Sequence, residues 1–276
     1  MYCRSMPHIF SLKEQTIVVT GATGALAGAT AQHLVSEGAH VVFVSRTQSN
    51  IDEAVSACIG LKGTATGFAC DVTDSASVTE LRDEVLAKFG RIDGLVNGAG
   101  GNKPGAVVGP DASIFDLDIA DYNKVLELNL QGTLIPSLVF AEAMVKQGKG
   151  SIVNFSSMAA RPVITRVLGY SNAKAAIDNQ TKWLAVELAK RHGEGVRVNA
   201  VAPGFFVGEQ NRALLLNPDG SLTDRGQRIV EKTPMGRFGA SEEVVGAVHY
   251  LLSDAARFVT GDVLAIDGGF SAFSGV

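Results

Sequence analysis

Short apolar runs alternate with longer stretches of helical periodicity along almost the whole chain. The runs that predict buried strands cover residues 17–20, 41–44, 66–70, 94–97, 151–155, 196–201 and 262–266. Apolar positions at helical spacing predict helices at about 25–37, 50–59, 75–89, 120–147, 170–192 and 241–252. Strands and helices that alternate in this way form a parallel sheet with helices on both faces. The pattern predicts an α/β fold with a doubly wound parallel sheet of about seven strands in one domain.

Two of these helices carry more detailed predictions. In 170–192 the residues at helical spacing should face the core, and they are Ala173, Ile177, Leu184 and Leu188. Gly193 is placed to end this helix. Pro136 falls inside the 120–147 pattern, where it removes a backbone donor, so we expect it to kink or divide that helix.

Three segments show no regular pattern. Residues 1–10 are expected to form a loose extension ahead of a single domain that covers 11–276. The stretches 99–119 and 204–240 are long and have the composition of loops. Long loops in compact domains usually carry function, and the second is the predicted substrate loop.

Composition narrows the class of protein. The 276 residues are 46% hydrophobic and 19% charged, as expected for a globular chain with a sizeable core. A net charge of −4 argues against nucleic acid or an anionic membrane as a partner. We expect no membrane-spanning helix, no secretory signal and a cytoplasmic location with Cys3, Cys58 and Cys70 reduced. The five histidines lack the spacing of metal ligands, so no metal site is expected.

The first candidate for chemistry is the stretch Tyr170-Ser-Asn-Ala-Lys174. Residues four apart on a helix share one face, so the phenol and the ammonium group should lie one turn apart. A nearby ammonium group favours the phenolate, so the pKa of Tyr170 should fall toward the range useful for acid–base catalysis. Ser157 follows the predicted strand 151–155, at the sheet edge where such folds bind ligands, whereas Ser156 should face the other way.

The second candidate is a turn of small residues after the first strand. Residues 21–28 read Gly-Ala-Thr-Gly-Ala-Leu-Ala-Gly and lead from strand 17–20 into helix 25–37. Small residues let the backbone approach a pyrophosphate, and the helix N-terminus faces its charge. The turn therefore predicts a nucleotide site.

These motifs, in this order, resemble the short-chain dehydrogenase/reductase family. The resemblance runs from about residue 11 to the C-terminus and implies a Rossmann-type sheet and hydride transfer to or from a nicotinamide cofactor. It implies that Tyr170 donates or removes the substrate proton and that Lys174 lowers the pKa of the phenol and holds the nicotinamide ribose. It also implies that Ser157 bonds the substrate oxygen and that Asn129 holds a water linking Lys174 to solvent.

The same resemblance names the cofactor contacts. In the glycine turn they are Gly21, Thr23, Gly24, Ala25 and Leu26, and alanines at 25 and 27 depart from the family's glycines. Asp71 and Val72 belong beside the adenine, and Pro203, Gly204 and Phe206 beside the nicotinamide. The turn Asn97-Gly98-Ala99 holds the sheet and passes its own backbone close to the cofactor. Gly98 replaces a family asparagine, and Gly208 replaces a threonine that touches the carboxamide.

The end of the second predicted strand bears on the choice of cofactor. An acidic residue there would bind the ribose hydroxyls of NAD, but this chain has Ser45 and Arg46. An arginine can pair with a 2′-phosphate, so NADP(H) is favoured and NAD(H) is the alternative.

Several stretches are most similar to the sugar-acid branch of the family, the mannonate (fructuronate) and gluconate oxidoreductases. They are 97–102, 203–206, 209–215, 233–239 and 267–276. This likeness implies a substrate carboxylate and hydroxyls, for which the candidates are Asn102, Arg166, Asn211 and Arg212. The alternative is that Arg166 and Arg212 form structural salt bridges to loops or to a neighbouring subunit, and both interpretations stay open.

Alternatives and assembly complete the hypothesis. A catalytically silent nucleotide-binding sensor would be favoured by loss of Ser157, Tyr170 or Lys174, all of which are present. A dehydratase or epimerase would be expected to carry a further C-terminal substrate domain. The family commonly forms homotetramers through long helices and last strands, and the apolar tail with Phe270 and Phe273 is expected at a subunit boundary.

Overall fold

Seven parallel strands form one sheet through the centre of the domain. The structure is a computed structural model that describes residues 8–208 and 211–275. The strand order is β3-β2-β1-β4-β5-β6-β7. The strands are β1 (Thr16–Thr20), β2 (His40–Ser45), β3 (Thr64–Ala69), β4 (Gly94–Asn97), β5 (Gly150–Phe155), β6 (Val196–Pro203) and β7 (Val263–Ile266). The predicted doubly wound parallel sheet is confirmed, with strand ends that differ by a few residues.

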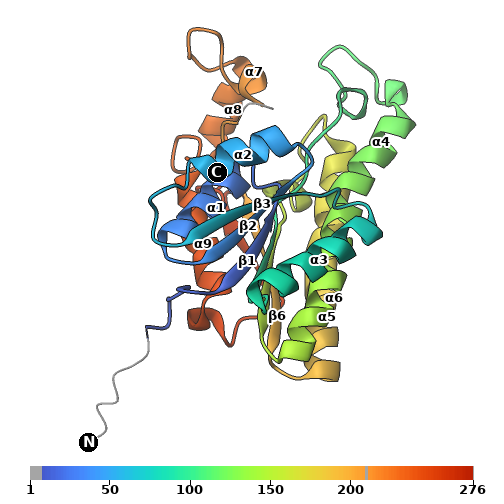
Figure 1. Ribbon diagram of the computed structural model, residues 1–276. Coiled ribbons are helices and arrows are strands. Elements are labelled where there is room, and N and C mark those ends of the chain that lie inside the picture. Colours follow the sequence, from blue (N-terminus) through green and yellow to red (C-terminus); the bar gives the residue numbers. More distant parts are fainter. Residues whose placement is uncertain (1–7, 209–210, 276) are drawn as a thin grey trace, which may run out of the picture.

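Helices cover both faces of this sheet (Figure 1). One face packs against α1 (Ala25–Ser36), α2 (Gln48–Ser56) and α9 (Glu242–Leu252). The other packs against α3 (Ser75–Phe89), α5 (Gly132–Gln147) and α6 (Leu168–His192). Because β1, β4, β5 and β6 are buried on both faces, their side chains form continuous apolar runs. Burial of each large aliphatic side chain there contributes roughly 1.5–3 kcal/mol.

The two segments expected to be loops contain short helices. Residues 99–119 carry two 3-10 turns, Pro104–Ala106 and Ile114–Asp116, and lead into α4 (Ile119–Leu126). Residues 204–240 carry α7 (Arg212–Leu215) and α8 (Asp224–Lys232). Helix α8 escaped the sequence pattern because it is mostly polar and buries only Gly226 and Ile229.

The predicted helix 120–147 is divided, but Pro136 is not the point of division. The break is a π-helical segment, Glu127–Gln131, in which the N–H of Gly132 bonds the carbonyl of Glu127. Helix α5 then runs through Pro136. The prediction about Pro136 was therefore wrong about the place, since a proline one turn into a new helix removes a single backbone bond.

The helical run Ile119–Gln147 is long and apolar enough, by length and composition alone, to cross a membrane. This differs from the expectation that the chain has no membrane-spanning helix. In the fold the run is a packed helix: Phe140 and Met144 are fully buried and contact the same core cluster as Leu81 of α3. Packing against the sheet accounts for its apolar composition.

Both described ends of the chain contact the rest of the domain. The N–H of Ala255 donates to Ile9 O at 2.9 Å, and His249 donates to Phe10 O at 2.6 Å. The predicted loose extension otherwise falls on residues 1–7, which lie outside the described residues. At the other end the ring of Phe270 packs edge-on against Phe205, with centroids 5.3 Å apart.

Candidate active site

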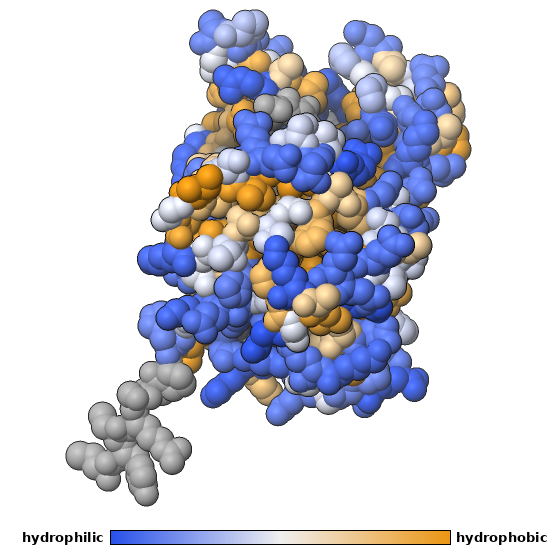
Figure 2. Space-filling model, viewed as in Figure 1, coloured by the Kyte–Doolittle hydropathy of each residue, from blue (hydrophilic) through white to orange (hydrophobic). Residues whose placement is uncertain are grey.

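A cavity of about 1110 Å³ runs along the carboxyl edge of the sheet. It exceeds the roughly 300–1,000 Å³ of a typical single-ligand pocket. Its walls come from the turn between β1 and α1, the ends of β4, β5 and β6, and helices α6, α7 and α8. Figure 2 shows the upper end of the molecule as two lobes with a hollow between them, and Figure 1 places α7 and α8 on one side and the segment before α4 on the other.

The turn after β1 is built for close approach of a ligand. Gly21 has a φ of +67°, and a Cβ there would lie 2.7 Å from Gly98 O, so only glycine fits. Helix α1 begins after Gly24 with no side-chain cap and no acidic residue in its first turn. Its free N–H groups and positive dipole end are suited to a phosphate. Thr23, Gly24, Ala25 and Leu26 line the cavity, as predicted for a nucleotide site.

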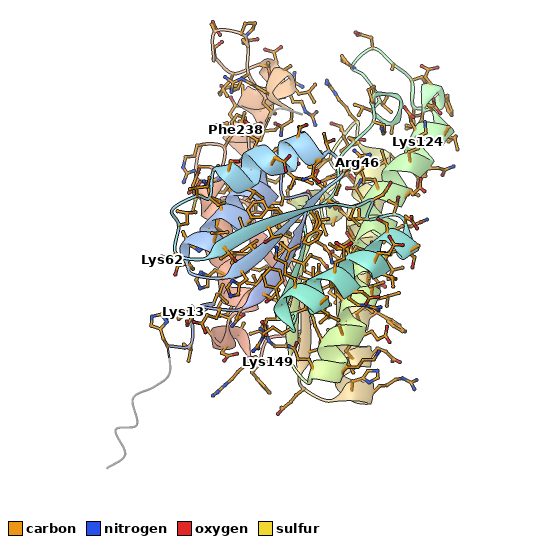
Figure 3. All side chains as sticks on the ribbon, in the orientation of Figure 1. Lys13, Arg46, Lys62, Lys124, Lys149 and Phe238 are labelled. Carbon is orange, nitrogen blue, oxygen red and sulfur yellow. The ribbon has the colours of Figure 1, made fainter. Side chains whose placement is uncertain are left out.

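The end of β2 lies beside this turn. The hydroxyls of Ser45 and Thr23 share a hydrogen bond of 3.1 Å. Arg46 is exposed at the sheet edge (Figure 3) and does not line the cavity. Glu53 of α2 does line it. Arg46 therefore reaches only a ligand group that extends past the cavity rim.

Four further predicted cofactor residues do not line the cavity: Asp71, Val72, Asn97 and Ala99. Hydrogen bonds from Thr73 lower the pKa of Asp71, and the charge of Arg46 adds to this. The amide of Asn97 donates to Asn154 and to Ser137, which ties β4 to β5 and α5.

The end of β6 supplies the opposite wall with Pro203, Gly204 and Phe206. Asn211 closes the turn that follows: its amide donates to Phe206 O at 2.8 Å and accepts from Gly208 N at 2.8 Å. Gly208 has no side chain where the family has a threonine, and Asn211 fixes the backbone of this turn in its place. Asn211 also lines the cavity.

Ser157 and Tyr170 meet at the inner end of the cavity. Ser157 caps a short 3-10 turn (Met158–Ala160) and accepts from Ala159 N at 3.1 Å. Burial raises the pKa of Tyr170, and a hydrogen bond with Ser157 opposes that rise. Ser156 donates to Asp178 on α6, the helix that carries Tyr170, and it lines the same cavity as Ser157. The prediction that Ser156 turns to the other face was therefore wrong, because its hydroxyl bonds the same helix.

Lys174 is buried below the tyrosine and only 4% exposed. Its ammonium group donates to Phe155 O at 2.7 Å and lies 5.3 Å from the Tyr170 ring centroid. Burial lowers the pKa of Lys174 to about 8, and Asp178 opposes the shift. The predicted lowering of the Tyr170 pKa by Lys174 was wrong, because burial of the phenol raises that pKa.

Asn129 lies in the π-helical segment, a type of irregularity that is frequent at functional sites. Its side chain donates to Gly101 O at 2.7 Å and accepts from Gly101 N at 3.2 Å. A Cβ at Gly100 would lie 2.6 Å from the Asn129 oxygen and 3.6 Å from the Lys174 nitrogen. Asn129 therefore fixes the loop after β4 against Lys174.

The predicted substrate residues differ in whether they line the cavity. Asn102 lines the cavity together with Asn211, whereas Arg166 and Arg212 do not. Sequence reasoning missed Arg225 of α8, which does. No sequence signal pointed to Arg225, because the polar helix that carries it escaped the sequence pattern. Among residues 8–208 and 211–275, no group of three or more His, Cys, Asp or Glu is placed to hold a metal ion.

Comparison with known proteins agrees with this geometry. Residues 21–271 match the family of short-chain dehydrogenases described as enoyl-(acyl carrier protein) reductase. The chain is a short-chain dehydrogenase/reductase. It is 40% identical to the uncharacterized oxidoreductase UxuB of Bacillus subtilis, over 96% of this chain and 98% of that protein.

Two solved structures of the family bear on the cofactor. A candidate D-mannonate oxidoreductase from Haemophilus influenza with bound NAD has a TM-score of 0.88 and 40% identity, covering 96% of this chain and 98% of that one. A candidate gluconate 5-dehydrogenase from Beutenbergia cavernae, with NADP at low occupancy, has a TM-score of 0.84 and 34% identity, covering 96% and 100%. This short-chain dehydrogenase/reductase is accordingly an enzyme that acts on CH–OH groups with a nicotinamide cofactor.

Proposed function

We propose that the enzyme is an NADP(H)-dependent oxidoreductase that interconverts a secondary alcohol and a ketone in a sugar acid of the mannonate/fructuronate or gluconate type. The observation that carries the proposal is one cavity with a phosphate-binding turn at one end and Ser157, Tyr170 and Lys174 at the other. The comparisons give no support to a catalytically silent sensor.

The bound cofactor supplies or accepts the hydride. In the reduction direction Ser157 donates a hydrogen bond to the ketone oxygen, where negative charge develops. Tyr170 gives its phenolic proton to that oxygen, and Lys174 holds positive charge beneath the phenol. Asn129 keeps the loop after β4 in place over Lys174. In oxidation the proton moves the other way.

NADP(H) is proposed because β2 ends in Ser45 and Arg46, without an acidic residue to bind ribose hydroxyls. A 2′-phosphate that extends past the cavity rim would meet the Arg46 guanidinium. NAD(H) is the second candidate, and one observation favours it: Glu53 lines the cavity and Arg46 does not.

A sugar acid is proposed because relatives at 40% and 34% identity are candidates for D-mannonate and gluconate oxidation. Asn102 and Asn211 offer amide groups to hydroxyls, and residues 204–240 act as the substrate loop. Arg166 and Arg212 remain proposed contacts that would require movement toward the cavity.

We also propose a cytoplasmic homotetramer. Cys58 and Cys70 are free thiols, as in reducing compartments. The outer faces of α5 and α6 expose Leu138, Trp183 and Val186, which are apolar enough to pair with a second copy.

The test follows the absorbance of reduced nicotinamide with purified protein, both cofactors, and a panel of aldonates, keto-acids and neutral polyols. The proposal expects turnover of at least one acid and a higher kcat/KM with NADP(H) than with NAD(H). Turnover of neutral polyols alone would overturn the sugar-acid substrate, and no turnover with either cofactor would overturn the proposed reaction.

A further inference from the structure

Arg225 lies in the wall of the same cavity as Ser157 and Tyr170. It is the second residue of α8 and is half-buried. Its guanidinium donates to the hydroxyl and the carbonyl oxygen of Thr165, at 3.3 and 3.4 Å. Both distances lie beyond the usual 2.7–3.2 Å range of N–H···O bonds. Two long contacts leave most of its five donors free for a ligand.

The position of Arg225 is electrostatically costly. Burial lowers the pKa of Arg225, and the like charge of Arg166 lowers it further. The positive end of the α8 dipole adds to the repulsion. Within 8–208 and 211–275, neither arginine forms an ion pair with an acidic side chain. The negative charge of an anionic ligand would offset the effects of burial, of the Arg166 charge and of the helix dipole together.

The backbone around Arg166 holds the two cations together. Arg166 has a φ of +79°, in the left-handed region that non-glycine residues rarely adopt. Its carbonyl accepts from Val108 N at 2.9 Å, which ties it to the lobe before α4. Thr165, which contacts Arg225, lies five residues before Tyr170 in the sequence. The cation pair is therefore anchored to the segment that enters the catalytic helix.

We propose that Arg225 binds the carboxylate of the substrate, with the nearby charge of Arg166 adding to the attraction, and so selects acids over neutral alcohols. This inference rests on the proposed function, because it concerns the substrate of that same site. A planar fork binds a carboxylate through two parallel hydrogen bonds, which fixes the orientation of the substrate as well as its charge. Arg212, exposed and outside the cavity, is not needed for this role.

The test compares Arg225→Gln and Arg225→Lys with the wild type on matched pairs: an aldonate and its neutral amide. Arg225→Gln should lower kcat/KM for the acid roughly 10- to 100-fold, the value of hydrogen bonds to a charged group, mainly through KM. Turnover of the amide should change less than about threefold, and Arg225→Lys should restore only part of the loss because a point charge replaces the fork. Arg228→Gln, on the exposed side of the same helix, is the control and should match the wild type.

Equal losses on acid and amide would overturn the inference and make Arg225 structural. A wild type that prefers the amide would also overturn it, while leaving the oxidoreductase function intact. If the wild type turns over no member of the panel, the proposed function fails. Calorimetry with D-gluconate then still decides the inference: binding lost in Arg225→Gln supports it, and no binding to the wild type overturns it.

Discussion

A β-carbon at position 98 would lie 2.5 Å from the β-carbon of Ala27, closer than two such atoms approach in proteins. Both positions depart from the family pattern: Ala27 replaces a glycine of the nucleotide turn, and Gly98 replaces an asparagine after β4. The two departures compensate each other, because the methyl group of Ala27 occupies the space in which a side chain at position 98 would lie.

This relationship predicts a coupled pair of substitutions. Gly98→Ala should destabilise the fold by about 1–3 kcal/mol through overpacking against Ala27 and Thr20 O. Adding Ala27→Gly should recover part of that loss, although a glycine in a helix alone costs about 1 kcal/mol. Urea unfolding at fixed protein concentration should give a favourable coupling energy of at least ~0.5 kcal/mol.

Ala31→Gly is the control for this cycle, because Ala31 is buried one turn farther along α1. Combined with Gly98→Ala it should be additive. If Ala27→Gly were additive with Gly98→Ala as well, the compensation between positions 27 and 98 would be refuted.

Tyr170→Phe removes the phenolic proton and keeps the ring. The turnover number should fall by roughly 10²-fold or more, the range of general acid–base catalysis. Cofactor affinity, measured by fluorescence titration, should stay within about threefold because binding depends mainly on the turn after β1. Tyr250→Phe on α9, outside the cavity lining, should behave as the wild type. A Tyr170→Phe enzyme with near-normal turnover would remove Tyr170 from the mechanism.

The sheet and the catalytic group were predictable because each depends on local signals. Strands buried on both faces are apolar runs, and the residues after them meet at one edge, so Ser157, Tyr170 and Lys174 could be placed from sequence spacing. Contacts between distant segments gave no such signal. The rise in the pKa of Tyr170 depends on burial in the assembled fold, and the position of Arg225 depends on a polar helix that only packing against residues 211–222 reveals. The prediction from Pro136 failed because the irregularity lies earlier in the chain, in the π-helical segment whose Asn129 bonds Gly101.

The reduction rate should depend on the charge of Lys174. Burial lowers the pKa of Lys174 to about 8, so the ammonium form is present below that pH and lost above it. Since reduction needs that charge beneath the proton donor, kcat/KM for the ketone should be level in mild acid and fall as pH rises through about 8. The measurement is a pH–rate profile in buffers of constant ionic strength.

Asp178→Asn provides the internal check on this profile. The carboxylate of Asp178 raises the pKa of Lys174, so its removal should move the fall in rate to lower pH. A profile that the substitution leaves unmoved, or one that is level through pH 9, would contradict the assignment to Lys174.

Arg46→Ala should weaken NADPH and leave NADH nearly unchanged, because only NADPH carries a 2′-phosphate for the guanidinium. The expected loss in kcat/KM for NADPH is about 10-fold, as for one charged hydrogen-bond partner at an exposed site. Ser45→Asp combined with Arg46→Ala should shift preference toward NADH, through attraction to the ribose hydroxyls and repulsion of the phosphate. Arg257→Ala is the charge-matched control, because Arg257 is exposed and follows the 3-10 turn Asp254–Ala256. A wild type that prefers NADH would show that Glu53, which lines the cavity, outweighs Arg46.

The last prediction concerns assembly through α5 and α6. Trp183 and Val186 are 61% and 55% exposed on α6, and Leu138 on α5 is 51% exposed. If these side chains form a subunit interface, Trp183→Glu buries a charge there and should convert tetramers to dimers in sedimentation velocity. Ile59→Glu changes an equally apolar residue that is 83% exposed after α2, and it should leave the tetramer intact.

The tail tests the second interface separately. Phe270 packs on Phe205 of its own chain, whereas Phe273 is 41% exposed, so of these two rings Phe273 offers more apolar surface to a neighbouring subunit. Phe273→Ser should therefore weaken the tetramer without unfolding the domain, while deletion of 270–276 should also reduce activity by exposing Phe205, which lines the cavity. Because the two contacts are distinct, a Phe273→Ser enzyme that stays tetrameric at low concentration would place the tail on its own chain, whatever the result with Trp183→Glu.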